Sequence, residues 1–120
     1  MIAKDFAAAA FGAVDAMDVE RFATHLTDDC VFIFGNAEPV VGKGAIAAYV
    51  DGFFSMLAGL RHDLLDVWQV ADVIINRIQV TYTRRDGHRM SFPCAVIWRM
   101  RDGRIADYRI FIDNTPLFAS

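Results

Sequence analysis

Residues 89–113 read RMSFPCAVIWRMRDGRIADYRIFID, and this stretch decides how the second half of the chain folds. The Asp-Gly pair at 102–103 stands between two apolar runs, which is a strong signal for a β-hairpin with a two-residue turn. The pattern therefore predicts two long antiparallel strands, over residues 89–100 and 104–113.

The same pattern continues toward the N-terminus. A second Asp-Gly pair, at 86–87, joins this hairpin to an apolar run at 73–84. Ala71-Asp72 is a weaker turn signal, and it follows another run at 61–70. We expect four antiparallel strands connected as a meander.

The first half of the chain has helical spacing instead. Apolar residues over Lys4–Met17 favour an Ala-rich helix, Asp18 is placed to cap a short second helix, and residues 43–58 favour a third. A continuous apolar strand, Cys30–Phe34, separates the second helix from the third. Helices followed by a meander predict an α+β fold, in a single domain over residues 1–120.

Composition and charge exclude several classes of protein. The net charge is −3 and the basic residues are scattered, so the chain lacks the basic surface that binds nucleic acids. No apolar run is long enough to cross a membrane, and the N-terminal stretch contains acids that a signal peptide lacks. The two cysteines are isolated in a chain without export signals, which predicts reduced thiols and a cytoplasmic protein. No ligand spacing suggests a metal and no Gly-rich loop suggests a nucleotide, so no cofactor is expected.

The turns assign the side chains of the meander to faces. If both Asp-Gly pairs are two-residue turns, Trp98 lies opposite Asp107, and Cys94 lies opposite both Gln79 and Phe111. Directly opposed residues share a face of the sheet. If Ala71-Asp72 is a tight turn as well, one face collects His62, Leu64, Asp66, Trp68, Arg77, Gln79, Thr81, Phe92, Cys94, Val96, Trp98, Phe111 and Asp113.

Both faces of this predicted sheet are apolar, so both must be covered. Helices can cover one face, and a second copy of the chain, in a homodimer, is the simplest cover for the other. The first face adds Arg77, Gln79 and Asp113 to its apolar walls, which is typical of a small-molecule pocket. The opposite face of the last two strands carries Pro93, Ala95, Ile97, Tyr108, Ile110 and Ile112.

Three stretches carry a resemblance to a known family: LTDDCVFIFGNAEPVVGKGAI at 26–46, LRHDLLDVW at 60–68 and DGRIADYRIFIDNTPLF at 102–118. With them the chain resembles the SnoaL-like branch of the NTF2-like superfamily, which includes polyketide cyclases, ketosteroid isomerase and limonene-1,2-epoxide hydrolase. The resemblance implies a cone in which a curved antiparallel sheet and three N-terminal helices enclose an apolar pocket. It specifies the fold better than the reaction, because this scaffold hosts many activities.

The resemblance to the epoxide hydrolases places Asp113 at their water-activating aspartate, Arg77 at their pocket arginine and Asn36 at their water-positioning asparagine. Phe34 stands where these enzymes have a tyrosine, and Gln79 stands where they have the aspartate that protonates the epoxide. An amide cannot deliver a proton to an alkoxide at neutral pH, so this sequence departs from that mechanism.

The resemblance to ketosteroid isomerase does not extend to its catalytic groups. The position of its general base falls at about Phe34, its oxyanion tyrosine near Ala10 and its protonated aspartate near Val96, and all three residues are apolar here. In the polyketide cyclases an acidic residue on the last strand serves as acid and base, a role that Asp113 matches.

We therefore expect three residues to carry chemistry. Asp113 would act as the base, Arg77 would hold it ionised and order the substrate's oxygen, and His62 would be a further acid or base. Structural alternatives stay open: Asp113 as a turn former, Arg77 in an ion pair with Asp66, and His62 in a purely structural role. Gln79 is either a core amide with its hydrogen bonds satisfied or a partner for the substrate. The residues expected to bind substrate are Asn36 (or a turn residue bonding its own backbone), Gln79, Phe34, Tyr49, Phe53, Phe92, Cys94, Trp98 and Phe111.

These features predict a protein that binds a small apolar metabolite in the cone pocket and performs cofactor-independent acid/base chemistry of the cyclase, isomerase or hydrolase type. Two alternatives belong to other classes. One is a non-catalytic protein that binds a ligand in the same pocket. The other is a dimerisation module in which Trp68, Trp98 and Phe111 fill the cavity.

Overall fold

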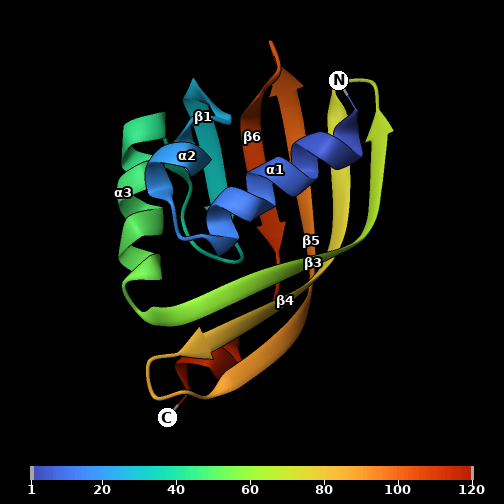
Figure 1. Ribbon diagram of the computed structural model, residues 1–120. Helices are drawn as coiled ribbons and strands as arrows, with labels where there is room; N and C mark the ends of the chain where they lie inside the picture. Colours follow the sequence, from blue (N-terminus) through green and yellow to red (C-terminus); the bar gives the residue numbers. More distant parts are fainter. Residues whose placement is uncertain (1, 120) are drawn as a thin grey trace.

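The computed structural model describes residues 2–119 and confirms the predicted α+β fold (Figure 1). Six strands form one open, curved sheet in the order β2-β1-β6-β5-β4-β3, in which β1 and β6 are parallel and the other neighbours antiparallel. The helices are α1 (Ala3–Asp15), α2 (Val19–Ala23), α3 (Lys43–Phe54) and the short 3₁₀ helix η1 (Thr115–Phe118). The strands are β1 (Leu26–Phe34), β2 (Val40–Val41), β3 (Leu57–Val70), β4 (Val73–Arg84), β5 (Arg89–Arg101) and β6 (Arg104–Phe111).

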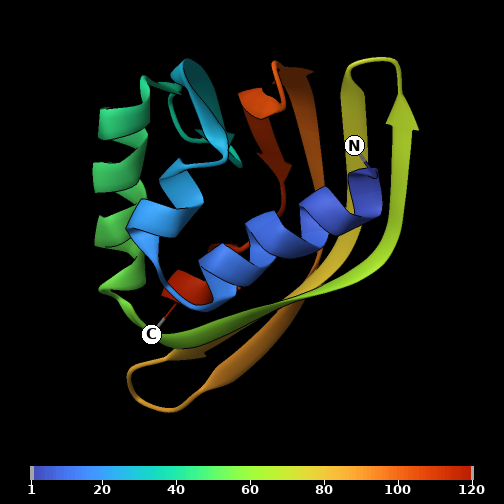
Figure 2. The same ribbon diagram turned by 45° about the horizontal axis from the view of Figure 1, so that its top comes forward.

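The helices lie on the concave side of the sheet. In Figures 1 and 2, α1 crosses in front of the strands while α3 stands beside β1 at one edge. Phe11 of α1 stacks on Trp98 of β5, with 5.1 Å between ring centroids, and Trp98 is fully buried. Asp18 caps α2, as predicted, by accepting a hydrogen bond from the Arg21 backbone N–H at 3.1 Å. The concave side of the sheet is therefore the core side.

The β5–β6 hairpin has the predicted turn but a different register. Arg101 pairs with Arg104 across Asp102-Gly103, yet a bulge follows, so that Trp98 pairs with Tyr108 and not with Asp107. The predicted pairing was wrong by one residue over most of β6. A one-residue shift exchanges the two faces of a strand, and this register buries Tyr108 where the predicted one would have buried Asp107.

The β4–β5 connection was also predicted one residue out of register. The turn has three residues between Arg84 and His88 where two were predicted. The Arg84 N–H donates to the His88 carbonyl at 2.8 Å and closes this longer turn. Cys94 therefore lies opposite Ile78 and not Gln79. Alternate residues of β4, including Ile78, Val80 and the polar Asn76, are buried in the core, whereas Arg77 and Gln79 are exposed on the opposite face.

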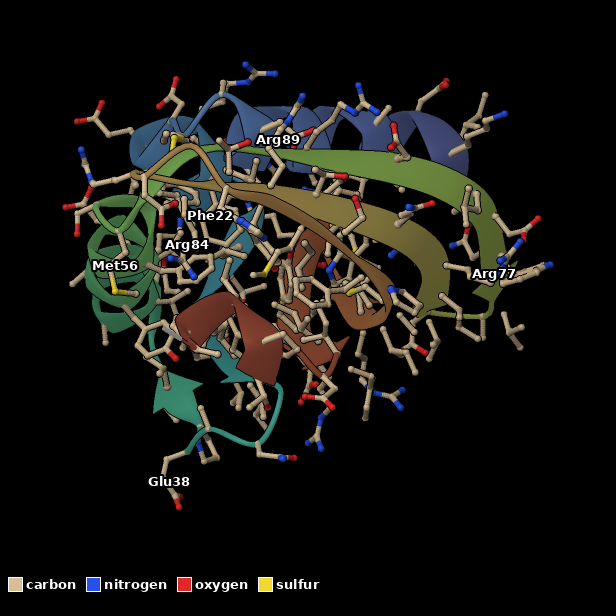
Figure 3. All side chains as sticks on the ribbon, turned by 90° about the horizontal axis from the view of Figure 1, so that it is seen from below. Phe22, Glu38, Met56, Arg77, Arg84 and Arg89 are labelled. Carbon is tan, nitrogen blue, oxygen red and sulfur yellow. The ribbon has the colours of Figure 1, made fainter. Side chains whose placement is uncertain are left out.

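The β3–β4 turn at Ala71-Asp72 was predicted correctly, since Val70 pairs with Val73. A bulge after Leu64 keeps Asp66 opposite Arg77, while His62 lies opposite Val80 and not Thr81. Figure 3 shows Arg77 directed away from the interior. No helix within residues 2–119 is long and apolar enough to span a membrane.

Candidate functional site

The cone encloses a narrow space, which we call the inner cavity. Its volume is about 40 Å³, and its walls are almost entirely apolar. Only His62, Tyr49, Tyr82, Tyr108 and Cys94 bring polar atoms or sulfur to it. It is lined by Val14, Phe22, Phe32, Phe34, Tyr49, Val50, Phe53, Phe54, Leu60, His62, Tyr82, Cys94, Val96, Tyr108 and Ile110.

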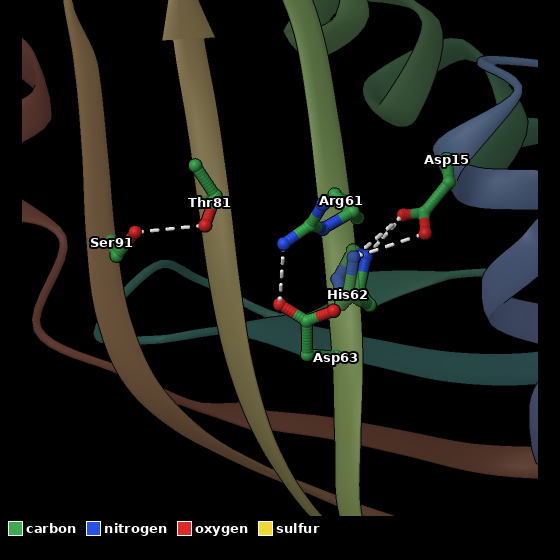
Figure 4. Close-up of polar contacts among 6 residues, drawn as sticks. All are labelled: Asp15, Arg61, His62, Asp63, Thr81 and Ser91. Atoms are coloured by element: carbon green, nitrogen blue, oxygen red, sulfur yellow. Dashed lines mark hydrogen bonds and ion pairs between the residues drawn. The ribbon is translucent and has the colours of Figure 1, made fainter.

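His62 is held in place by Asp15, the last residue of α1 (Figure 4). The Asp15 carboxylate accepts a hydrogen bond from the His62 ring Nδ1 at 2.6 Å and bonds from the His62 backbone N–H at 3.0 and 3.1 Å. A carboxylate only accepts hydrogen bonds, so Nδ1 carries the proton of this bond, and in the neutral ring the lone pair is on Nε2. The His62 ring stacks on Phe11 with 4.9 Å between centroids, which fixes the plane of the imidazole.

Three other polar groups of the inner cavity, on Cys94, Tyr82 and Tyr108, are neutral. Burial raises the pKa of the Cys94 thiol to about 12, and it raises the pKa of Tyr82 and of Tyr108 above the ordinary value. At neutral pH these groups are a thiol and two phenols, which can donate hydrogen bonds but cannot act as bases. Among the residues that line the inner cavity, His62 is the one able to accept a proton.

A larger space, the mouth pocket, opens at the end of β6. Its volume is about 500 Å³, and it shares three aromatic residues with the inner cavity, namely Phe34, Tyr49 and Phe53. These rings stand between the two spaces. The mouth pocket is lined by Phe34, Gly35, Asn36, Ala37, Tyr49, Gly52, Phe53, Met56, Ile112, Asp113, Asn114, Thr115 and Phe118.

Asp113 lies in the wall of the mouth pocket and is exposed to solvent. Its Oδ1 accepts hydrogen bonds from the Thr115 hydroxyl at 2.7 Å and from the Thr115 backbone N–H at 3.2 Å. These bonds lower the pKa of the Asp113 carboxyl below its ordinary value. Asp113 is thus a turn-forming residue, as the structural alternative supposed, and it also faces a cavity.

The model of the SnoaL-like domain family matches residues 7–108. The chain belongs to the SnoaL-like domain family. Among curated proteins, none matches its sequence.

Solved structures share the fold of this SnoaL-like chain. An epoxide hydrolase of the LEH-like kind from Mycobacterium tuberculosis is 17% identical with a TM-score of 0.82, and the match covers 97% of this chain and 86% of that one. A putative SnoaL-like polyketide cyclase from Jannaschia is also 17% identical with a TM-score of 0.82, covering 95% and 87%. An uncharacterised cystatin-fold protein from Novosphingobium aromaticivorans is 20% identical with a TM-score of 0.80, covering 92% and 98%. These likenesses confirm the NTF2-like fold, and the family supports a small-molecule-binding or catalytic role.

The structure brings together part of the predicted site of the SnoaL-like chain. Asn36 and Asp113 line the mouth pocket, His62 and Cys94 line the inner cavity, and the aromatic residues Phe34, Tyr49 and Phe53 line both. Trp98 and Phe92 are buried in the core but line neither space.

Arg77 and Gln79 were predicted to share a cavity with Asp113, and this prediction was wrong. Both side chains lie on the convex face of the sheet because the register of β4 differs by one residue. Arg77 donates to Asp66 through Nε at 2.8 Å and through Nη2 at 2.6 Å, as the ion-pair alternative supposed. It is therefore not available to hold Asp113 ionised.

The convex face carries a shallow groove of about 540 Å³, which we call the outer groove. Phe111 was predicted to line the inner pocket but lies here, with 54% of its surface exposed. Three residues of the predicted outer apolar row were misplaced: Tyr108 and Ile110 point inward, and Ile112 lines the mouth pocket. The outer groove is lined by Leu65, Arg77, Ile78, Gln79, Ser91, Phe92, Pro93, Cys94, Ala95 and Phe111.

Sequence reasoning missed Asp15 altogether. The available signal was an acid at the end of an apolar helix, where the negative end of the helix dipole makes a carboxylate unfavourable without other partners. Only the fold brings it beside His62, 47 residues away in the chain. Within residues 2–119, no group of three or more His, Cys, Asp or Glu side chains is placed to hold a metal ion.

Proposed function

We propose that this SnoaL-like chain binds a small apolar molecule in the cone and transfers a proton within it without a cofactor, with His62 as the general base and Asp15 as its positioning residue. The observation that carries the proposal is the 2.6 Å bond from His62 Nδ1 to Asp15 at the wall of an apolar cavity. A base whose second ring nitrogen is bound to a carboxylate is fixed in tautomer and orientation, which proton transfer requires.

The proposed step is the removal of a proton from a carbon next to a carbonyl group. His62 Nε2 accepts the proton, and the electron pair moves into the carbonyl oxygen to form an enol or enolate. The neutral phenols of Tyr82 and Tyr108 are the hydrogen-bond donors for that oxygen. Return of the proton to a different atom gives an isomerisation, and attack by the enol carbon on a second carbonyl gives a cyclisation.

The sizes of the two spaces decide how a substrate lies. A volume of about 40 Å³ holds roughly one water molecule, whereas ligand pockets usually measure about 300–1,000 Å³. The body of the substrate therefore occupies the mouth pocket, and only its reacting group passes between the rings of Phe34, Tyr49 and Phe53. Movement of these rings is part of the proposal.

Asp113 remains the second candidate for the base because it lines the mouth pocket. Its lowered pKa makes its carboxylate a weak base, and Arg77 does not assist it. The homodimer and the cytoplasmic location expected from the sequence also remain proposals.

The test is hydrogen–deuterium exchange of enolisable ketones and lactones in D₂O, followed by NMR, since exchange reports proton removal even without a net product. Epoxides are also assayed, because their opening does not require the removal of a proton from carbon. We expect His62→Asn to slow exchange by about 10²–10⁴-fold and Asp113→Asn to have little effect. A matched control is Asp63→Asn, which changes a carboxylate beside His62 that binds Arg61 instead.

The rival function is binding without turnover. It predicts that ligands protect the protein against unfolding while His62→Asn leaves affinity and every measured rate unchanged. Full exchange activity in His62→Asn together with its loss in Asp113→Asn would instead assign the base to Asp113.

A further inference from the structure

The mouth pocket has an uneven charge. Among its lining residues, all of which lie within residues 2–119, Asp113 is the only charged side chain and there is no Lys, Arg or His. An anionic ligand would meet this carboxylate without a compensating cation. The pocket is therefore suited to neutral or cationic ligands.

The walls around Asp113 are aromatic. Phe34, Tyr49, Phe53 and Phe118 all line the mouth pocket, and they come from β1, α3 and η1. Phe118 has 60% of its surface exposed and Tyr49 has 40%, so both rings are accessible to a ligand. The faces of aromatic rings attract cations, and quaternary ammonium groups above all.

Asp113 has one carboxylate oxygen to offer. Both of its hydrogen bonds from Thr115 end on Oδ1, and within residues 2–119 no partner is found for Oδ2. The Thr115 bonds hold the carboxylate in place at the start of η1. The free oxygen is thus fixed in a pocket wall that also carries aromatic rings.

From this arrangement we propose that the mouth pocket recognises an organic ammonium group, a protonated tertiary amine or a quaternary ammonium, carried by the ligand of the cone. The positive group lies against Asp113 and the aromatic walls, while the apolar remainder extends toward the inner cavity. The inference rests on the proposed function only in taking the mouth pocket as the place where the ligand's body is held. It does not depend on His62 acting as a base.

The test compares three compounds of one shape by NMR titration of the protein. Choline is the cation, dimethylbutanol is its neutral isostere with carbon in place of nitrogen, and dimethylbutanoate is an anion with the same branched end. We expect choline to bind about tenfold more tightly than the alcohol, and the anion to bind most weakly. Added salt should weaken choline binding alone, because it screens an exposed charge pair.

Two variants locate the preference. Asp113→Asn should remove most of the preference for choline, and Phe118→Leu should reduce it while leaving the affinity for the alcohol nearly unchanged. The matched control is Asp102→Asn, which removes the same charge at the opposite end of β6. It should leave the preference intact.

The outcomes separate this inference from the proposed function. Equal binding of choline and the alcohol, tighter binding of the anion, no binding of any of the three, or an unchanged preference in Asp113→Asn would each overturn it. Titration of His62→Asn, which keeps the mouth pocket, should reproduce the parent's preference. If exchange activity is absent but the preference is present, only the proposed function fails.

Discussion

The carboxylate of Asp15 binds both the backbone N–H and the ring Nδ1 of His62, so one side chain fixes the position and the tautomer of another that lies 47 residues away. The pair joins the end of α1 to the middle of β3 at the wall of the inner cavity. The side chain of His62 is 10% exposed and that of Asp15 is 26% exposed. A largely buried hydrogen bond to a carboxylate is costly to break on one side only, because the remaining group loses its partner.

We predict that Asp15→Asn destabilises the fold by about 1.5–3 kcal/mol, the usual contribution of a hydrogen bond to a charged group. The amide can also donate its N–H to Nδ1 and so favour the opposite tautomer, with the proton on Nε2. Urea unfolding measures the first effect, and the pH profile of exchange activity measures the second. Asp63→Asn should change stability by less than about 0.5 kcal/mol. Equal losses in both variants would show that the Asp15 contact has no special role.

A second prediction concerns the two buried thiols. Burial raises the pKa of both Cys30 and Cys94 to about 12, from 9.0 in the unfolded chain. The folded state therefore holds these protons more tightly, and their contribution to stability is complete below pH 9 and is lost as the pH rises from 9 toward 12. At pH 8 iodoacetamide should label neither thiol in the native protein, and both in urea, as measured by mass spectrometry. Rapid native labelling of Cys94 would show that its surroundings are open to solvent.

A third prediction concerns the outer groove. Leu65, Trp68 and Phe111 expose 48%, 49% and 54% of their surface on the convex face of the sheet. Large apolar side chains exposed together on one face are typical of a protein–protein interface. We expect a homodimer through this face, and we expect Phe111→Asp to raise its dissociation constant at least about tenfold. The control Val41→Asp places the same charge on the edge strand β2, where it should have no effect. Sedimentation of the parent as a monomer at micromolar concentration would contradict the proposal.

Much of the fold could be predicted from local patterns. Capping by Asp18, the turn at Ala71-Asp72 and the Asp102-Gly103 turn all depend on neighbours in the chain, and all were correct. The strand registers could not be obtained in the same way. The bulge near Ala106 is favoured because it buries Tyr108. That stabilisation comes from packing in the assembled core, which the turn residues do not specify.

The candidate site was harder to predict for the same reason. Residues of one strand, such as Cys94 and Trp98, were placed correctly relative to each other, because the side-chain period of two needs no partner. The two one-residue register shifts cancel between β4 and β6, so Arg77 and Phe111 do share the convex face. Asp113 parts from them because β6 ends at Phe111 and the chain turns toward η1. The contact of Asp15 with His62 depends on the packing of α1 against β3. The spacing of apolar residues in either segment does not predict this packing.

The last prediction asks which of the two spaces holds the reacting group. Cys94 lines the inner cavity, and a slightly larger apolar side chain at this position takes up part of a space of only about 40 Å³. Cys94→Val should therefore abolish exchange activity while changing stability by less than about 1.5 kcal/mol, as hydrophobic exchanges of similar volume usually do. Choline binding in the mouth pocket should stay the same, because Cys94 does not line it. The matched control is Cys30→Val, which alters a second buried thiol that lines neither space and should leave the activity in place. If Cys94→Val retained full activity, the reaction would take place in the mouth pocket, where Asp113 and not His62 is the available base.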